Sequence, residues 1–343
     1  MVVDDSVVIR RLVTQALEQD PALEVVGAAS NGVLELQRIP QWNPDVITLD
    51  IEMPDMDGLE MLRLIRRDYP HLRVIMFSTL TERGAAITLE ALTIGADDYV
   101  AKFSNQDSLD RSMTRLKEEM IPKIRQFFRF PGEPVFATVP SPQSIASPGG
   151  KVRPQAVVIG ISTGRPAALS RILPTLPADS PLPILIVQHM PPLFTRVLAE
   201  RLNVMCALHV EEAIQGSVVH GGKVMIAPGD FHLKLIRDQT TIRVSLDQSE
   251  QQNFCWPAVD VLFRSAAAIY GSAVIAVVLT GMGQDGLRGV EVLKAHGASV
   301  LTQDEESSVV WGMPGAVANA GLADLVLPLD EVIPQILRCS ERR

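Results

Sequence analysis

Short apolar runs alternate with amphipathic stretches over the first third of the chain. Apolar residues recur at helical spacing between these runs, for example over residues 59–67. Strands that alternate with helices are typical of βαβ units around a parallel sheet. The pattern predicts a doubly wound α/β domain over residues 1–125, whose first strand lacks residues because the chain starts close to it. The predicted strands lie at residues 2–3, 25–28, 45–49, 74–77 and 99–101.

Composition changes sharply between Pro131 and Pro154. Pro, Gly, Ser and Thr dominate this stretch, and no hydrophobic period survives in it. Such a segment buries too little apolar surface to offset the entropy that ordering costs. We therefore expect a flexible linker over residues 126–153, and a chain of 343 residues is long enough for a domain on each side of it.

A second α/β pattern covers residues 154–343. Within it, residues 218–246 show alternation and two tight glycine turns, at 220–223 and 228–230, which predict hairpins rather than crossovers. The whole pattern predicts an α/β domain with a mostly parallel sheet and a hairpin. The clearest strands are predicted at residues 156–161, 184–188 and 273–279.

Bulk composition narrows the function classes. Hydrophobic residues make up 47% of the chain and charged residues 21%, as in globular proteins, and the net charge of −9 is spread over both halves. An acidic balance disfavours a nucleic-acid-binding domain. No apolar run approaches the roughly 20 residues of a membrane span, and no signal-peptide pattern opens the chain. We therefore expect a cytoplasmic protein that neither binds nucleic acid nor inserts into a membrane. The chain has three scattered cysteines, Cys206, Cys255 and Cys339. Their odd number and wide spacing disfavour a disulfide framework or a zinc site.

Carboxylates follow two predicted strands of the first domain. Asp4 and Asp5 follow the first strand, and Asp50 ends another. Because the carboxyl ends of parallel strands meet at one edge, these groups should gather there, and an oxygen-only set suits Mg²⁺. Ser78 and Lys102 follow two further strands and offer the donors that a phosphoryl group needs. Each residue alone could be a solvated loop side chain, but the five together favour a phosphoryl site.

A serine and two candidate partners end strands in the second domain. Residues 160–164 have the pattern G-x-S-x-G, which places Ser162 on a tight turn before a helix. His189 follows one predicted strand, and Asp285 lies among glycines after another. A nucleophilic serine needs a base and a group that orients the base. His189 and Asp285 have the placement for these two roles.

Simpler interpretations of the same residues stay open. Gly/Ser turns before helices are common, and His189 could be an ordinary loop histidine. Asp285 could cap the helix that is predicted to begin at Gly286. The chain order Ser, His, Asp differs from the order in α/β-hydrolases, which argues for a separate occurrence of the triad.

The first domain resembles bacterial response-regulator receiver domains in the blocks VVDDS, LDIEMPDMDGLEML, FSTL and GADDYVAK. The resemblance implies a flavodoxin-like fold in which Asp50 is phosphorylated, with Mg²⁺ needed for that step only. It assigns contacts with the phosphoryl group to Ser78 and Lys102. It assigns the binding of Mg²⁺ to Asp4, Asp5, Asp50 and the backbone carbonyl of Glu52.

The second domain resembles the catalytic domain of chemotaxis protein-glutamate methylesterases, the CheB family, in the blocks VVIGISTGRPAAL, ILIVQHMP, MIAPGDFHL and VVLTGMGQDGLRGV. The resemblance implies Ser162 as nucleophile, His189 as general base and Asp285 as its orienting acid. Thr163 and the backbone around Met282 would lie in the oxyanion region. The implied reaction, which needs no cofactor, is hydrolysis of glutamate γ-methyl esters and deamidation of certain glutamines on the cytoplasmic helices of chemoreceptors.

Receiver, linker and esterase occur in this order in the CheB family, whose phosphodonor is a chemotaxis histidine kinase. We expect the receiver to obstruct the esterase cleft until Asp50 is phosphorylated. Two positions depart from the family pattern. Phe103 stands where receivers usually have proline, and Arg165 replaces the second glycine of S-T-G-G-P.

Three alternative functions compete with this hypothesis. A receiver with a DNA-binding or partner-binding output would need a helix-turn-helix pattern or a basic face, and neither is evident. A nucleotide-binding second domain would need a glycine fingerprint that the chain lacks. A catalytically degenerate esterase that serves as a protein-binding output stays open.

Overall fold

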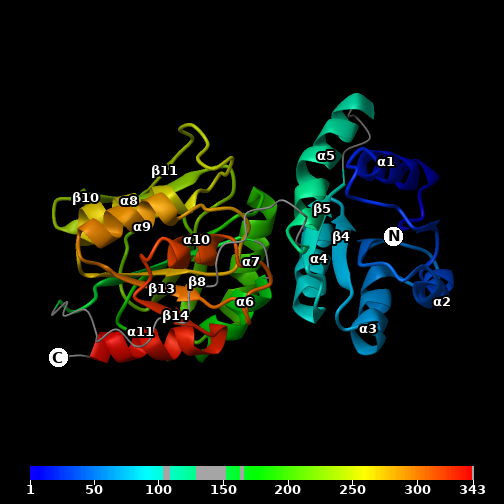
Figure 1. Ribbon diagram of the computed structural model, residues 1–343. Helices are drawn as coiled ribbons and strands as arrows, with labels where there is room; N and C mark the ends of the chain where they lie inside the picture. Colours follow the sequence, from blue (N-terminus) through cyan, green and yellow to red (C-terminus); the bar gives the residue numbers. More distant parts are fainter. Residues whose placement is uncertain (103–108, 129–151, 163–165, 342–343) are drawn as a thin grey trace. The chain divides into compact units, whose positions relative to one another are not determined.

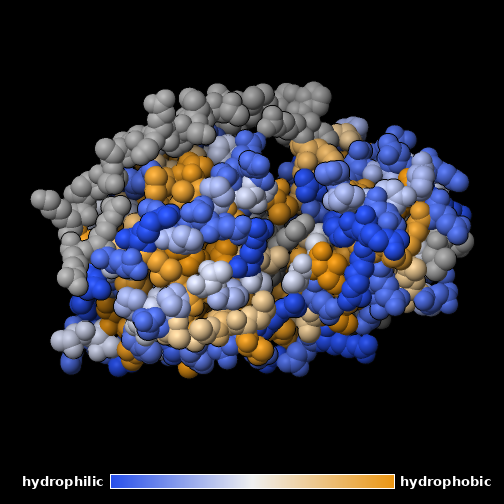
Figure 2. Space-filling model, turned by 90° about the horizontal axis from the view of Figure 1, so that it is seen from below, coloured by the Kyte–Doolittle hydropathy of each residue, from blue (hydrophilic) through white to orange (hydrophobic). Residues whose placement is uncertain are grey.

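The computed structural model describes residues 1–102, 109–128, 152–162 and 166–341. The chain divides into two compact units, Met1–Pro134 and Val135–Arg343, each with a parallel sheet of its own (Figure 1). Most of the expected linker, residues 129–151, lies outside the described part. None of the described helices is long and apolar enough to cross a membrane. On the face shown in Figure 2, hydrophobic residues form small groups among hydrophilic ones, as on most protein surfaces.

The first unit contains a five-stranded sheet in the order β2-β1-β3-β4-β5, and every pair of neighbours is parallel. This is the flavodoxin-like order, so the predicted fold class is confirmed. The strand expected at residues 25–28 is instead β2 at Ala28–Ala29, so the prediction was wrong for residues 25–27; β1 offers only Val2 and Val3 as partners. The strands are β1 (Val2–Val3), β2 (Ala28–Ala29), β3 (Val46–Asp50), β4 (Arg73–Ser78) and β5 (Asp98–Ala101).

Helices cover both faces of this sheet, with α1 and α5 on one face and α2, α3 and α4 on the other (Figure 1). The helix predicted at residues 59–67 is confirmed as α3, and it starts where the Asp57 carboxylate accepts a hydrogen bond from Glu60 N. The helices are α1 (Val7–Leu17), α2 (Gly32–Trp42), α3 (Gly58–Asp68), α4 (Glu82–Ile94) and α5 (Leu109–Arg125).

The second unit contains a seven-stranded parallel sheet in the order β14-β13-β12-β6-β7-β9-β8. Three of its strands match the predicted ones, because they are buried on both faces and therefore read as continuous apolar runs. The strands are β6 (Ala156–Ile161), β7 (Ile184–Gln188), β8 (His209–Glu212), β9 (Lys223–Ile226), β12 (Val274–Val278), β13 (Ser299–Gln303) and β14 (Leu325–Leu327).

Helices also cover both faces of the second sheet. Figure 1 shows α8 and α9 on one side and α6, α7 and α11 on the other. The helices are α6 (Pro166–Ile172), α7 (Pro192–Met205), α8 (Val259–Tyr270), α9 (Leu287–Ala295), α10 (Met313–Asn319) and α11 (Val332–Glu341), with 3-10 turns η1 (Leu173–Thr175) and η2 (Leu329–Glu331).

The segment over residues 218–246 contains a single hairpin, so the expectation of several was wrong. Strands β10 (His232–Asp238) and β11 (Thr241–Asp247) pair antiparallel across a turn at Gln239 and Thr240. The glycine turn at residues 220–223 leads instead into β9, which runs parallel to its neighbours. A Cβ on Gly221 would lie 2.1 Å from Pro181 O, so this glycine reflects close packing rather than a hairpin turn.

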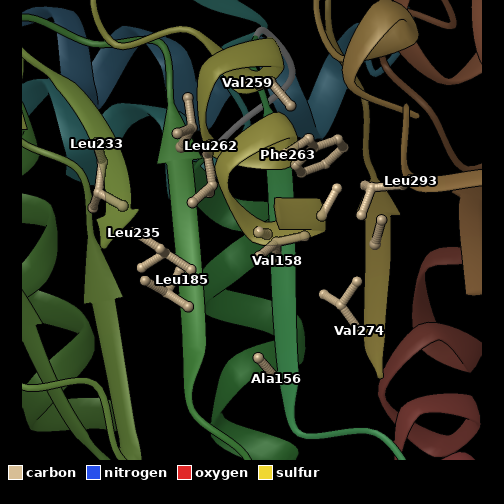
Figure 3. Close-up of a cluster of buried hydrophobic side chains, with 14 of the residues drawn as sticks. Ala156, Val158, Leu185, Leu233, Leu235, Val259, Leu262, Phe263, Val274 and Leu293 are labelled. Carbon is tan, nitrogen blue, oxygen red and sulfur yellow. The ribbon is translucent and has the colours of Figure 1, made fainter. Parts of the chain in front are cut away.

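The core between the sheet and α8 fixes where that helix begins. Figure 3 shows Ala156 and Val158 of β6 facing α8, whose Leu262 and Phe263 fill the space above the strands. All four side chains are fully buried. Burying each larger one stabilises the fold by about 1.5–3 kcal/mol. This packing holds the N-terminus of α8, at Val259, close to the carboxyl edge of the sheet.

Candidate active site and phosphorylation site

The second sheet changes its direction of growth at β6, which lies between β7 and β12. Ligands of open parallel sheets bind in the crevice at the carboxyl ends of the strands at such a switch point. Ser162 directly follows β6, His189 directly follows β7, and Asp285 lies in the loop after β12. The sheet therefore brings the three predicted residues to neighbouring strand ends.

The backbone of Ser162 is held from both neighbouring strands. Ser162 N donates to Thr280 O over 3.1 Å, and the Gln188 side chain donates to Ser162 O over 2.7 Å. His189 N in turn donates to Ile161 O over 3.2 Å, which extends the register between β6 and β7 by one residue. Ser162 and His189 therefore occupy facing positions at the end of the two strands.

Gly281 lies against Ser162 from the β12 side. A Cβ on Gly281 would lie 2.7 Å from the Cβ of Ser162 and 2.5 Å from the sulfur of Met313. Gly281 N also donates to Val310 O over 3.0 Å, so the glycine cannot move aside without loss of this bond. The glycine-rich loop after β12 is thus shaped by the need to pass close to the serine.

An imidazole–carboxylate pair forms the centre of the site. His189 Nε2 donates to Asp285 Oδ2 over 2.8 Å, and both side chains are largely buried. This bond leaves Nδ1 as the nitrogen with the free lone pair. Within the described residues, no hydrogen bond joins the Ser162 hydroxyl to the imidazole, and the partner of Nδ1 is Cys255 Sγ at 3.7 Å.

Asp285 is saturated with hydrogen-bond donors. Its oxygens accept from His189, from the Asn253 side chain over 2.8 Å, and from Gly286 N over 2.9 Å. They also accept from Val259 N and Asp260 N, the first N–H groups of α8, over 2.7 and 3.0 Å. Helix α9 has no side-chain cap, so the alternative in which Asp285 caps that helix is wrong. The carboxylate instead meets the positive end of α8.

These contacts set the charge of the pair. Burial acts to raise the pKa of Asp285, but the bonds from His189 and the α8 backbone outweigh it and lower that pKa. Burial acts to lower the pKa of His189, but Cys255 and Asp285 outweigh it and raise that pKa to about 10. The carboxylate therefore stays ionised at neutral pH and stabilises the imidazolium that forms when His189 accepts a proton.

His189, Cys255 and Asp285 also place candidate metal-ligand atoms within 4.8 Å of one another. Both oxygens of Asp285 already accept hydrogen bonds from nitrogen donors. A metal would have to displace those donors from a buried carboxylate. The geometry therefore suits an orienting acid and not a metal ligand.

The first sheet gathers its own acidic groups at its switch point. Asp4 and Asp50 are buried and share the Lys102 ammonium, at 3.0 and 2.7 Å, while Asp5 beside them is exposed. The three carboxylates place oxygens within 4.8 Å of one another. Burial, and then the charge of Asp4, raises the pKa of Asp50 to about 6 despite the ammonium of Lys102.

The donor set fits Mg²⁺, which prefers oxygen ligands. Asp50 Oδ2 is buried and has no hydrogen-bond partner among the described residues. Such an orphaned oxygen is costly in a folded protein unless a cation or a donor reaches it. Glu52 is exposed next to this edge, and its N–H donates to the other oxygen of Asp50 over 3.3 Å.

Ser78 lies at the expected strand end, but its hydroxyl is engaged elsewhere. Thr88 on α4 donates to Ser78 Oγ over 2.6 Å, and Ser78 Oγ donates to Gly84 O over 3.3 Å. To donate to a phosphoryl group on Asp50, the hydroxyl would have to turn away from Gly84 O. Lys102, by contrast, already contacts Asp50.

Comparisons with known proteins identify both units. Residues 157–336 match the CheB methylesterase family model, and residues 1–114 match the response regulator receiver domain. The chain belongs to the CheB methylesterase family. It is 47% identical to a protein-glutamate methylesterase/protein-glutamine glutaminase of Trichodesmium erythraeum, over 98% of this chain and 97% of that protein. A relative of the same name from Nocardioides is 51% identical, over 100% of this chain and 95% of that protein.

The solved CheB methylesterase catalytic domain of Thermotoga maritima shares the fold of the second unit. It is 46% identical, with a TM-score of 0.53, and covers 55% of this chain and 99% of that domain. The prediction of a receiver joined to a methylesterase is therefore confirmed. The roles of individual residues in this CheB-family chain rest on the geometry above.

Three of the residues singled out in the sequence fall in undescribed segments, and a fourth lies beside the serine. Thr163, Arg165 and Phe103 lie outside the described residues. Met282 follows Gly281 beside Ser162, and 43% of its surface is exposed.

Sequence reasoning missed the residues that support Asp285. Asn253 donates to both Asp285 and Asp260, over 2.8 and 3.0 Å, and Asp260 accepts from Gly289 N over 2.7 Å. Asn253 has a positive φ of 52°, a conformation that Asn tolerates better than most residues. No motif or period marks it, because its role depends on contacts made only in the folded chain.

Proposed function

We propose that this CheB-family chain hydrolyses glutamate γ-methyl esters on chemoreceptors, and deamidates specific glutamines there, through Ser162, His189 and Asp285. The 2.8 Å bond between His189 and Asp285, beside Ser162 at the switch point of the sheet, carries the proposal. The names of the curated relatives supply the substrate class. The proposed location of the reaction is the cytoplasm, where the receptor helices are reached.

The proposed mechanism follows from the orientation of the imidazole. Asp285 holds His189 through Nε2, so Nδ1 accepts the proton as Ser162 Oγ attacks the ester carbonyl. N–H groups of the loop around Met282 would stabilise the oxyanion. The C–O bond then breaks, methanol leaves with the proton from Nδ1, and an acyl-serine remains. Water repeats the sequence and releases glutamate, and with a glutamine substrate the leaving group is ammonia.

The proposed regulation acts through Asp50, which would accept a phosphoryl group from a chemotaxis histidine kinase. Asp4, Asp5, Asp50 and the Glu52 carbonyl would hold Mg²⁺, and the charge of the bound ion would offset the repulsion between these carboxylates and a phosphoryl donor. Lys102 would exchange its contact with Asp50 for the new phosphoryl oxygens. The proposed result is release of the esterase cleft from obstruction by the receiver.

The test is methanol release from methylated receptor by the full-length chain, with and without a small acyl phosphate and Mg²⁺. Ser162→Ala should reduce turnover by roughly 10³-fold or more, because only binding and oxyanion contacts would remain. Ser245→Ala on β11 is the matched control and should keep full turnover. Full turnover by Ser162→Ala would reject the triad, and equal rates with and without the phosphodonor would reject the switch.

A further inference from the structure

Cys255 lies beside the imidazole of the candidate active site. Its sulfur is 3.7 Å from His189 Nδ1 and 3.3 Å from Asn253 O. The residue is partly buried, but the neighbouring Phe254 is 95% exposed, so the loop that carries them is at the surface. A small reagent can therefore reach a thiol that touches the proposed general base.

Cys255 and Ser162 compete for the same nitrogen, His189 Nδ1. Nε2 is committed to Asp285, so Nδ1 carries the free lone pair. Of the two acceptors near the thiol, the imidazole can take its proton, whereas the carbonyl of Asn253 cannot. A thiol is a stronger acid than a serine hydroxyl, so Cys255 can compete with Ser162 to give its proton to Nδ1.

The product of that transfer is a thiolate beside an imidazolium. Asp285 stabilises the imidazolium from the other side, which is the arrangement of nucleophile, base and orienting acid that activates cysteine. Burial, by contrast, raises the pKa of the Cys206 thiol to about 11, so the same chain contains an unreactive reference.

We propose that Cys255 is a modification site at which a thiolate, formed by proton transfer to His189, reacts with peroxides and other small electrophiles. With a peroxide, a sulfur lone pair attacks one oxygen as the O–O bond breaks. The sulfur is oxidised to sulfenic acid, and the hydroxide that leaves takes a proton to become water. The effect on turnover rests on the proposed function: the added oxygen lies next to Nδ1 and prevents His189 from accepting the proton of Ser162.

The first experiment measures thiol reactivity without any substrate. The full-length chain is treated with limiting iodoacetamide, and alkylation of Cys206, Cys255 and Cys339 is followed by peptide mass spectrometry. At pH 7, Cys255 should react at least about 10-fold faster than the other two.

His189→Gln is the matched variant for this measurement. It should lower the rate of Cys255 to that of the reference cysteines, while unchanged rates at Cys206 and Cys339 report that the fold is intact. Equal rates for all three cysteines in the unmodified chain would overturn the proposal. A rate at Cys255 that survives His189→Gln in a folded chain would also overturn it.

The second experiment links the modification to turnover. Hydrogen peroxide should inactivate methyl-ester hydrolysis in step with dimedone labelling of Cys255, and dithiothreitol should restore it. Cys255→Ala should keep its own starting turnover under the same treatment; inactivation equal to that of the natural chain would reject the link. A chain without turnover before treatment would contradict the proposed function, whereas the alkylation result would still decide the thiolate.

Discussion

The buried carboxylate of Asp50 should cost the receiver unit stability at neutral pH, and Asp50→Asn should remove that cost. Asp50 is 1% exposed, and burial and the charge of Asp4 raise its pKa from 3.8 to about 6. At ~1.4 kcal/mol per pKa unit, the difference corresponds to about 3 kcal/mol. An amide of the same shape carries no charge to desolvate, so the variant should be more stable by up to that amount.

The pH dependence gives the sign of the effect. Below pH 3.8 the carboxyl group of Asp50 is protonated in both the folded and the unfolded chain, so the variant gains nothing. Between pH 3.8 and about 6 only the unfolded chain ionises, so the stability of the natural protein falls as pH rises. Above about 6 the folded chain carries the charge, and the gain from Asp50→Asn levels off at its full value.

Scanning calorimetry of the full-length chain in EDTA measures this gain as a shift of the receiver transition. About 3 kcal/mol should raise its Tm by roughly 10 °C at pH 7 and by almost nothing near pH 3. Asp5→Asn, an exposed carboxylate at the same sheet edge, is the control and should stay within ~0.5 kcal/mol. A loss of stability at pH 7, or an equal gain at both pH values, would refute the reasoning.

Two further substitutions test the contacts that support the sites. Asn253→Ala removes one hydrogen-bond donor from Asp285. Because a buried hydrogen bond to a charged group contributes about 1.5–3 kcal/mol, kcat for ester hydrolysis should fall roughly tenfold with little change in KM. An unchanged kcat would show that Asn253 does not support the active site. Thr88→Val removes one contact that holds Ser78 Oγ, so the hydroxyl should turn more easily from Gly84 O toward a phosphoryl group. Phosphorylation of the receiver, measured with a radiolabelled acyl phosphate, should be up to about fivefold faster. Thr93→Val on the same helix is the control. Equal phosphorylation rates in the two variants would contradict the idea that Thr88 restrains the Ser78 hydroxyl.

The parts of the fold that were predictable are those whose sequence pattern has a single physical cause. Strands β6 and β7 were predicted at their observed bounds, because burial on both faces requires an unbroken apolar run. The glycines at residues 220–223 do not form the hairpin turn that their pattern predicts, because glycine has two uses. It allows the tight turn of a hairpin, and it also allows close approach of two backbones, as at Gly221 against Pro181.

The sequence predicts the active-site residues that follow the strands, but not those in the loop that contains Asn253 and Cys255. Ser162, His189 and Asp285 are found by the rule that ligands gather where parallel strands end. Asn253 and Cys255 come from a loop whose contacts to Asp285 and His189 span 32 and 66 residues of sequence. No local pattern encodes such contacts, so only the folded chain shows that a thiol and an amide complete the surroundings of the pair.

The two sheet edges use carboxylates in opposite ways, and the difference lies in the donors around them. Asp285 accepts from five N–H groups, including the start of α8, and its pKa is lowered. Asp50 has a buried oxygen with no hydrogen-bond partner among the described residues, and its pKa is raised to about 6. A saturated carboxylate can only hold its neighbour in place, whereas an unsatisfied one attracts a cation and an electrophilic phosphorus. The same fold principle therefore yields a rigid orienting acid in one unit and a reactive acceptor in the other.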